Sequence, residues 1–213
     1  MKTPPDKVRI IVLASGQGTN FQALLDAERA GLLEGACIAG LIAGAPGARV
    51  LERARLAQVK ALVEEPDPRL PQAERRRELS DRILQDLQAL AGDMVILAGF
   101  LSILRGPLLQ TYGGRILNIH PSLLPKFGGP GMYGERVHRA VLSSGDRESG
   151  CTVHLVDAGI DTGPVLLQRR VPVFPGDTAA SLAERVHGAE HAALVEAAAL
   201  MARRISKTKE PLG

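Results

Sequence analysis

The chain has few aromatic residues: no tryptophan, two tyrosines and four phenylalanines among 213 residues. A surface that stacks the bases of single-stranded nucleic acid needs several aligned rings, so this composition argues against that class of protein. Basic residues outnumber acidic ones by only 26 to 23. A surplus this small favours an anionic small molecule over a nucleic acid as the binding partner.

Long apolar runs and clustered cysteines are also missing. No run approaches the roughly 18 apolar residues that a membrane-spanning helix requires. The first apolar run, 8–14, follows a polar, proline-containing start and is too short for the core of a signal peptide. The two cysteines, Cys37 and Cys151, lie in apolar surroundings typical of core residues, and a reducing compartment would leave them as thiols. We therefore expect a cytoplasmic protein with no membrane partner.

Short runs rich in leucine and β-branched residues alternate with longer segments of helical periodicity. The runs at 8–15, 37–44 and 94–100 are apolar at consecutive positions, which is typical of parallel strands buried on both faces. This alternation predicts an α/β fold with a mostly parallel, twisted sheet and helices on both faces, a Rossmann-like arrangement. Further strands are expected at 60–65 and 116–121, with helices at about 19–31, 46–57 and 72–91.

The pattern changes in the second half of the chain. A loop rich in glycine and proline at 126–135 leads to a short helix at about 135–144. The apolar runs at 152–158 and 164–174, separated by a turn, predict late antiparallel strands added to the parallel sheet.

An alanine-rich segment closes the chain. It predicts a helix over about 178–204, for which Asp177 or Thr178 is a suitable cap. The following residues, ISKTKEPLG at 205–213, are expected to fray.

A glycine-rich loop, SGQGTN at 15–20, follows the first strand and opens the first helix. Such a loop places backbone N–H groups and the positive end of the helix dipole at the carboxyl edge of the sheet, where a phosphate can bind. Phe21 stands where a dinucleotide fingerprint needs its third glycine, and no GK[ST] follows, so neither a nicotinamide cofactor nor ATP is indicated. A tight turn capped by Thr19 or Asn20 is the structural alternative.

Two polar features follow in the later strands. Asn118 and His120 are two residues apart on one strand, so their side chains project from the same face, and Pro121 ends the strand. The turn DAGIDTGP at 157–164 can present Asp161 at an edge of the sheet. Each feature alone also has a purely structural interpretation, because buried histidines and turn aspartates are common.

Taken together, these segments resemble one enzyme family. SGQGTN, LAGF at 97–100, NIHPSLLP at 118–125 and DTGP at 161–164 occur in the order and spacing of the glycinamide ribonucleotide formyltransferases, as does RVHGAEH at 185–191. The resemblance covers about residues 8–200. It implies transfer of a formyl group from 10-formyltetrahydrofolate, a co-substrate, to the amine of 5-phosphoribosylglycinamide in de novo purine biosynthesis. It implies no metal and no covalent intermediate.

The resemblance also implies that Asn118, His120 and Asp161 are catalytic. An amine attacks the formyl carbonyl, so the tetrahedral intermediate carries an oxyanion, which the neutral Asn118 amide can stabilise. Protonated His120 can donate to the same oxygen and then to the departing folate nitrogen. Asp161 can stabilise the imidazolium and hold a water that relays the proton from the attacking amine.

Further residues are assigned to the two substrates by matching positions in the family. The ribonucleotide set is Gly18, Thr19, Asn20, His187 and Glu190. The folate set is Arg76, Leu101, Ser102, Ile103, Leu104, Asn118, Asp157, Ala158, Gly159, Ile160 and Asp161. Ser102 replaces a longer basic residue of some relatives. The loop GGPGMYGERVH at 128–138 is longer than in several relatives. Its glycines would permit a mobile lid, and a disordered surface loop is the alternative.

The resemblance implies one formyltransferase domain over 1–213. It consists of a phosphate-binding half (7–125), a folate-site and C-terminal helix half (126–205) and a tail (206–213). We expect a monomer or homodimer that binds small molecules and no nucleic acid.

Three other functions compete with this one. HGAEH at 187–191 fits a zinc-hydrolase pattern, but the five histidines show no other cluster to supply a third ligand. Formyl transferases of initiator methionyl-tRNA and formyltetrahydrofolate hydrolases share the core motif, but carry further domains that we do not expect here. A non-catalytic ligand-binding module would not need to keep Asn118, His120 and Asp161 together.

Overall fold

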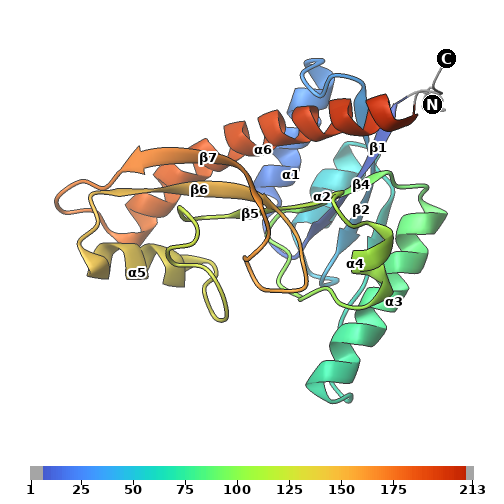
Figure 1. Ribbon diagram of the computed structural model, residues 1–213, viewed down its shortest axis with the longest axis horizontal. Helices are drawn as coiled ribbons and strands as arrows, with labels where there is room; N and C mark the ends of the chain where they lie inside the picture. Colours follow the sequence, from blue (N-terminus) through green and yellow to red (C-terminus); the bar gives the residue numbers. More distant parts are fainter. Residues whose placement is uncertain (1–6, 210–213) are drawn as a thin grey trace.

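The computed structural model describes residues 7–209, which form one seven-stranded sheet with helices on both faces (Figure 1). The strands are β1 (Val8–Ala14), β2 (Ala36–Ala43), β3 (Ala61–Val63), β4 (Met94–Leu97), β5 (Ile116–His120), β6 (Glu148–Leu155) and β7 (Val165–Pro172). The helices are α1 (Thr19–Arg29), α2 (Val50–Leu56), α3 (Gln72–Ala89), α4 (Pro107–Thr111), α5 (Glu135–Ser144) and α6 (Ala179–Lys209). No helix within this range is both long and apolar enough to cross a membrane.

The strand order is β3-β2-β1-β4-β5-β6-β7. The first five strands pair in parallel, whereas β6 runs antiparallel to β5 and β7 antiparallel to β6. The predicted mostly parallel sheet with late antiparallel strands is therefore confirmed. The order reverses between β1 and β4, and in open α/β sheets such a switch point leaves a crevice at the carboxyl ends of the strands, where ligands bind.

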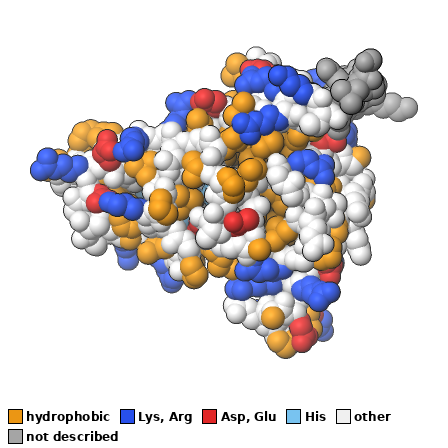
Figure 2. Space-filling view, in the orientation of Figure 1, with side chains coloured by type: hydrophobic (Ala, Val, Ile, Leu, Met, Phe, Trp, Pro, Cys, Tyr) orange, Lys and Arg blue, Asp and Glu red, His pale blue; other side chains and the backbone are white. Residues whose placement is uncertain are grey.

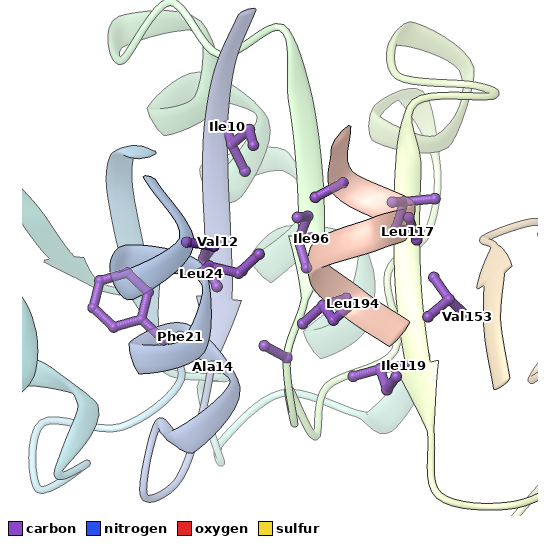
Figure 3. Packing of buried hydrophobic residues seen from close by; sticks show 14 of the residues in the cluster. Ile10, Val12, Ala14, Phe21, Leu24, Ile96, Leu117, Ile119, Val153 and Leu194 are labelled. Atoms are coloured by element: carbon purple, nitrogen blue, oxygen red, sulfur yellow. The ribbon is translucent and has the colours of Figure 1, made fainter. Parts of the chain in front are cut away.

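Alternate residues of β1 pack in two different hydrophobic cores. Val8, Ile10 and Val12 pack in the core that includes α1 and α6, whereas Ile11 and Leu13 pack in the core that includes α3 and α4. Figure 1 shows these two helix pairs on opposite sides of the sheet. Figure 3 shows the first core from close by, with Leu194 of α6 among side chains of β1, β4 and β5. Burial on both faces explains why these strands are apolar at consecutive positions.

The last helix begins as predicted but ends later. Thr178 caps it: the Ser181 N–H donates to Thr178 Oγ1 at 3.2 Å, and the Thr178 N–H donates to Ser181 Oγ at 3.0 Å. The predicted fraying from residue 205 is wrong for 205–209, because α6 continues to Lys209. Ile205 is only 6% exposed and belongs to the core shared with α1, so burial holds the last turn. The rest of the predicted tail, 210–213, lies outside the described residues.

Two early segments differ in detail from the sequence-based expectation. β3 spans only Ala61–Val63, at the edge of the sheet, where a strand pairs on one side. α4 was not expected from the sequence, because five residues show no helical period; its first turn carries Pro107, a residue suited to that position.

Candidate active site

A cavity of about 1120 Å³ lies at the carboxyl ends of β1, β4 and β5, at the switch point of the sheet. Its walls come from the glycine-rich loop after β1, the loop after β4, the end of β5, the segment 129–135, the turn after β6 and the first half of α6. On the face shown in Figure 2, Lys and Arg side chains form separate groups interspersed with apolar and acidic ones. This mixed distribution agrees with the small excess of basic over acidic residues in the sequence.

The three expected catalytic side chains meet in this cavity. Asn118 and His120 project from the same face of β5, as their spacing predicts. Asp161 lies beside both of them: Asn118 Nδ2 is 3.5 Å from Asp161 Oδ1, and His120 Nδ1 is 3.5 Å from Asp161 Oδ2. The structure thus brings together an amide, an imidazole and a carboxylate from two distant segments.

The backbone of the turn after β6 aims Asp161 at β5. Asp161 has a φ of 58°, in the left-handed region that aspartate tolerates better than most residues. The Gly129 N–H donates to Asp161 Oδ2 at 2.9 Å and anchors the carboxylate from the opposite side. The carboxylate is therefore fixed by two loops, and its side chain is almost buried.

His120 has oxygen acceptors at both ring nitrogens. Nε2 is 2.8 Å from the Phe127 carbonyl oxygen, which can only accept, so Nε2 carries a proton. Nδ1 faces the Asp161 carboxylate. This arrangement suits the doubly protonated ring, the form that can act as an acid. The Phe127 carbonyl is a backbone group that the sequence did not indicate.

His154, a residue that the sequence analysis missed, completes the cluster. It lies on β6 directly opposite Asn118, with Nε2 3.0 Å from Asn118 Nδ2 and 3.7 Å from Asp161 Oδ1. Burial lowers the pKa of His154, opposed by its contact with the Leu155 carbonyl and by the nearby Asp161. The antiparallel pairing of β5 and β6 could have revealed it, because directly opposed residues share one face.

His138 is a second histidine that the sequence analysis missed. It lies on α5, is 2% exposed and lines the cavity, and its Nδ1 has no hydrogen-bond partner. Burial, and then the neighbouring His187 and His120, lower the pKa of His138 to about 4. The ring is therefore neutral near pH 7. The sequence could have indicated the burial of His138, because it lies three residues before Val141 and both residues are on the buried face of α5.

The glycine-rich loop presents the start of α1 to the cavity. The cap of this helix is Gly18, with a φ of 73°, and no side chain caps it. The side-chain cap by Thr19 or Asn20, the structural alternative to phosphate binding, is therefore not formed. The first N–H groups of α1 have no partner within the helix and are available to an anion. Arg53 of α2 fixes the loop by donating from Nε to the Gln17 carbonyl oxygen at 2.8 Å.

Asn20 and Glu190 connect this loop to α6. Asn20 Nδ2 donates to Glu190 Oε2 at 3.3 Å. Glu190 is 5% exposed, and burial raises its pKa to about 7, although the Asn20 hydrogen bond acts in the opposite direction. His187, one turn earlier on α6, also lines the cavity. All five residues expected at the ribonucleotide therefore lie together.

Nearly all residues expected at the folate line the same cavity. Those that line it are Arg76, Leu101, Ser102, Ile103, Leu104, Asn118, Asp157, Gly159, Ile160 and Asp161. Ala158 does not line the cavity, and its carbonyl oxygen accepts a hydrogen bond from Arg105 Nη1. Asp157 closes the turn, because its Oδ1 accepts from the Gly159 N–H at 2.9 Å and from the Thr162 hydroxyl at 2.7 Å.

The HGAEH segment at 187–191 fits a zinc-hydrolase pattern in the sequence. Among residues 7–209, no group of three or more His, Cys, Asp or Glu side chains is arranged to hold a metal ion. The Nε2 atom of His191 is buried without a hydrogen-bond partner.

Comparison with known proteins gives a consistent result. The formyl transferase family model matches residues 8–198. The chain is 40% identical over 186 residues to the phosphoribosylglycinamide formyltransferase of Escherichia coli, an alignment that covers 87% of this chain and 82% of that protein. It is 41% identical over 196 residues to the trifunctional purine biosynthetic protein adenosine-3 of Drosophila melanogaster, covering 91% of this chain but only 14% of the fly protein.

A solved structure is similar along nearly the whole chain. The crystal structure of glycinamide ribonucleotide transformylase 1 from Symbiobacterium toebii has a TM-score of 0.85 and 41% sequence identity. The similarity covers 96% of this chain and 92% of that one.

Proposed function

The chain belongs to the formyl transferase family, and on that basis we propose that it transfers the formyl group of 10-formyltetrahydrofolate to the amine of 5-phosphoribosylglycinamide. The products are formylglycinamide ribonucleotide and tetrahydrofolate, in a step of de novo purine biosynthesis. The single observation that carries the proposal is the convergence of Asn118, His120 and Asp161 in one cavity beside the glycine-rich loop.

In this proposal both substrates bind in the same cavity. The glycine-rich loop offers the N–H groups of Gly18, Thr19 and Asn20 to the phosphate, and Glu190 with His187 faces the ribose side. The loop after β4 and the turn 157–161 form walls for the pterin, with Arg76 at the folate side of the cavity. The proposed catalytic triad of Asn118, His120 and Asp161 lines the same cavity.

The triad can promote each bond change in direct transfer. The substrate amine forms a C–N bond to the formyl carbon, and the carbonyl oxygen becomes an oxyanion that accepts from the Asn118 amide. His120 protonates the departing folate nitrogen as its bond to the formyl carbon breaks. Asp161 first stabilises the imidazolium. It then takes up the proton that the amine loses, directly or through a water. To donate in this way, His120 must exchange one of its present acceptors for the substrate.

We propose that the chain acts as one formyltransferase domain on small-molecule substrates, in the cytoplasm and as a monomer or homodimer. The single continuous sheet supports the one-domain part of this proposal, because both groups of binding residues lie on one set of strands and their loops.

An absorbance assay of folate deformylation tests the function. The full chain is mixed with 10-formyltetrahydrofolate in the presence and in the absence of 5-phosphoribosylglycinamide. A signal that requires the ribonucleotide supports the transferase. Equal rates with and without it would instead identify a hydrolase, and no signal in either case would identify a non-catalytic binder. Gln88→Ala, an exposed change on α3, serves as the control and should match the wild-type rate.

A further inference from the structure

His154 is placed against Asn118 by the register of the sheet. In the antiparallel pair β5 and β6, Asn118 and His154 are directly opposed, so their side chains lie close together on one face. His154 Nε2 is 3.0 Å from Asn118 Nδ2. The His154 side chain is 2% exposed, which excludes water as a competing partner for most of the ring.

The other ring nitrogen determines the tautomer of His154. Nδ1 is 2.9 Å from the Leu155 carbonyl oxygen. Because a carbonyl oxygen can only accept, Nδ1 must carry the proton. In the neutral ring Nε2 then has a lone pair and acts as an acceptor. The hydrogen bond to Asn118 therefore runs from the amide N–H to the histidine nitrogen.

This contact permits only one orientation of the Asn118 amide. If the amide were rotated by half a turn, its oxygen would face the lone pair of His154 Nε2 and the carboxylate of Asp161, which are both acceptors. In the observed orientation one N–H is held by His154, and the second makes only a 3.5 Å contact with Asp161 Oδ1. A contact of that length is weak, so the second N–H remains available to an incoming oxygen.

We propose that His154 is a positioning residue: as a neutral Nε2 acceptor it holds the Asn118 amide with its N–H edge toward the formyl oxygen. This inference rests on the proposed function of the cavity for the identity of that oxygen. The orientation itself depends only on contacts within the chain.

The proposal requires a neutral ring. A proton on Nε2 would place an N–H against the Asn118 NH₂ group and force the amide to rotate. The charged and titratable groups facing His154 are Asp161 and Asp157, which favour its protonation, and His120, which opposes it. Burial outweighs the two carboxylates and keeps the pKa of His154 below its usual 6.5. The amide orientation should therefore persist at neutral pH and fail in acid.

Nuclear magnetic resonance tests the orientation without any substrate. In the full chain, labelled with ¹⁵N, the histidine ring nitrogens report the tautomer directly. We expect His154 to be the neutral Nδ1–H form at pH 7.5. An Nε2–H tautomer or an imidazolium at that pH would overturn the proposal. Because no turnover is involved, this measurement tests the amide orientation even if the ribonucleotide is not the substrate.

Kinetics of paired variants test the consequence. His154→Phe fills the same space without an acceptor, and kcat should fall about 100-fold, the order of an oxyanion-hole donor lost. His154→Gln offers an acceptor oxygen, so its kcat should be at least about tenfold higher than that of His154→Phe, as expected for one restored hydrogen bond. The KM values of both substrates should stay within about threefold in each variant, because the interaction acts on the transition state.

The control is a half-buried histidine that does not line the cavity, His191→Phe on α6, which should keep a near-normal kcat. A further readout separates positioning from a structural role: the wild-type kcat should show an acid-side ionisation below pH 6.5 that His154→Gln lacks.

A His154→Phe variant with near-normal kcat, or a His154→Gln variant that is no faster than His154→Phe, would contradict the proposal. If either variant fails to fold, the tautomer measurement on the wild type decides.

Discussion

The Gly129 N–H donates a 2.9 Å hydrogen bond to Asp161 Oδ2, so the loop that precedes α5 is tied to the carboxylate of the proposed catalytic triad. The same loop also engages His120, whose Nε2 faces the Phe127 carbonyl oxygen. Two of the three triad residues are thus held by backbone groups of one loop. To act as an acid, His120 must exchange one of its two acceptors for the substrate, and exchange of the Phe127 carbonyl would couple motion of this loop to the proposed proton transfer.

Loop anchoring predicts a change in protease sensitivity. Tyr133, in the same loop, is 50% exposed and offers a chymotrypsin site. Asp161→Ala removes the acceptor of the Gly129 N–H, so cleavage near Tyr133 should be several-fold faster than in the wild type. Both substrates together should slow cleavage of the wild type. Asp67→Ala, which removes a distant ion pair with Arg69, is the control. Unchanged cleavage in Asp161→Ala and with ligands would argue against a lid.

Loss of the Asn118 or His120 side chain should abolish most turnover. Asn118→Ala removes the oxyanion donor and should lower kcat about 10²–10³-fold. His120→Ala should have an effect of about 10²–10⁴-fold, the usual contribution of a general acid. Circular dichroism and ligand binding by calorimetry should show that the fold and both binding sites persist. Near-normal turnover in either variant would refute the assigned role.

Glu190 predicts a pH-dependent stability. Burial raises its pKa from 4.5 to about 7, so folding favours the protonated carboxyl. This contribution is fully present below about pH 4.5 and is lost as pH rises through about 7. A shift of this size corresponds to about 3 kcal/mol of unfolding free energy. Glu190→Gln stays neutral, so its advantage over the wild type in urea unfolding should grow from pH 5 to pH 8. A constant difference across that range would contradict the prediction.

The glycine-rich loop depends on the backbone conformation of Gly18. Its φ is 73°, and an added Cβ would lie 2.5 Å from Val50 Cγ2. Gly18→Ala should therefore lower the free energy of unfolding by about 1–3 kcal/mol, the usual cost of a residue forced into the left-handed region. The KM of the ribonucleotide should rise while that of the folate changes little. Gly47→Ala, where an added Cβ meets nothing within 4 Å, is the matched control. Equal effects of both changes on the ribonucleotide KM would contradict the loop's role.

The strands and the main helices could be predicted because their cause is local. Consecutive apolar residues in β1 and β2 result from burial on two faces, and the stripe on α3 results from burial on one. The end of α6 could not be predicted, because contacts from other parts of the chain bury Ile205 within a polar stretch.

From the sequence, only those site residues that belong to recognisable motifs could be predicted. Asn118, His120 and Asp161 occur in such segments, and the structure brings them together. His154 stands alone in a strand, and its role emerges only from the antiparallel register that places it opposite Asn118. The Phe127 carbonyl and the Gly129 N–H are backbone groups, and every residue type except proline offers both. Their positions follow from loop geometry and not from residue identity.

The central claim is direct transfer of the formyl group between two substrates held in one cavity. Its most direct test uses 10-formyltetrahydrofolate labelled with ¹³C in the formyl carbon, together with 5-phosphoribosylglycinamide, and follows the label by nuclear magnetic resonance. The account predicts that the label appears on the glycinamide amine in equal amount to the tetrahydrofolate formed, and that Asn118→Ala suppresses both products together. Label released as free formate, with the ribonucleotide unchanged, would contradict it.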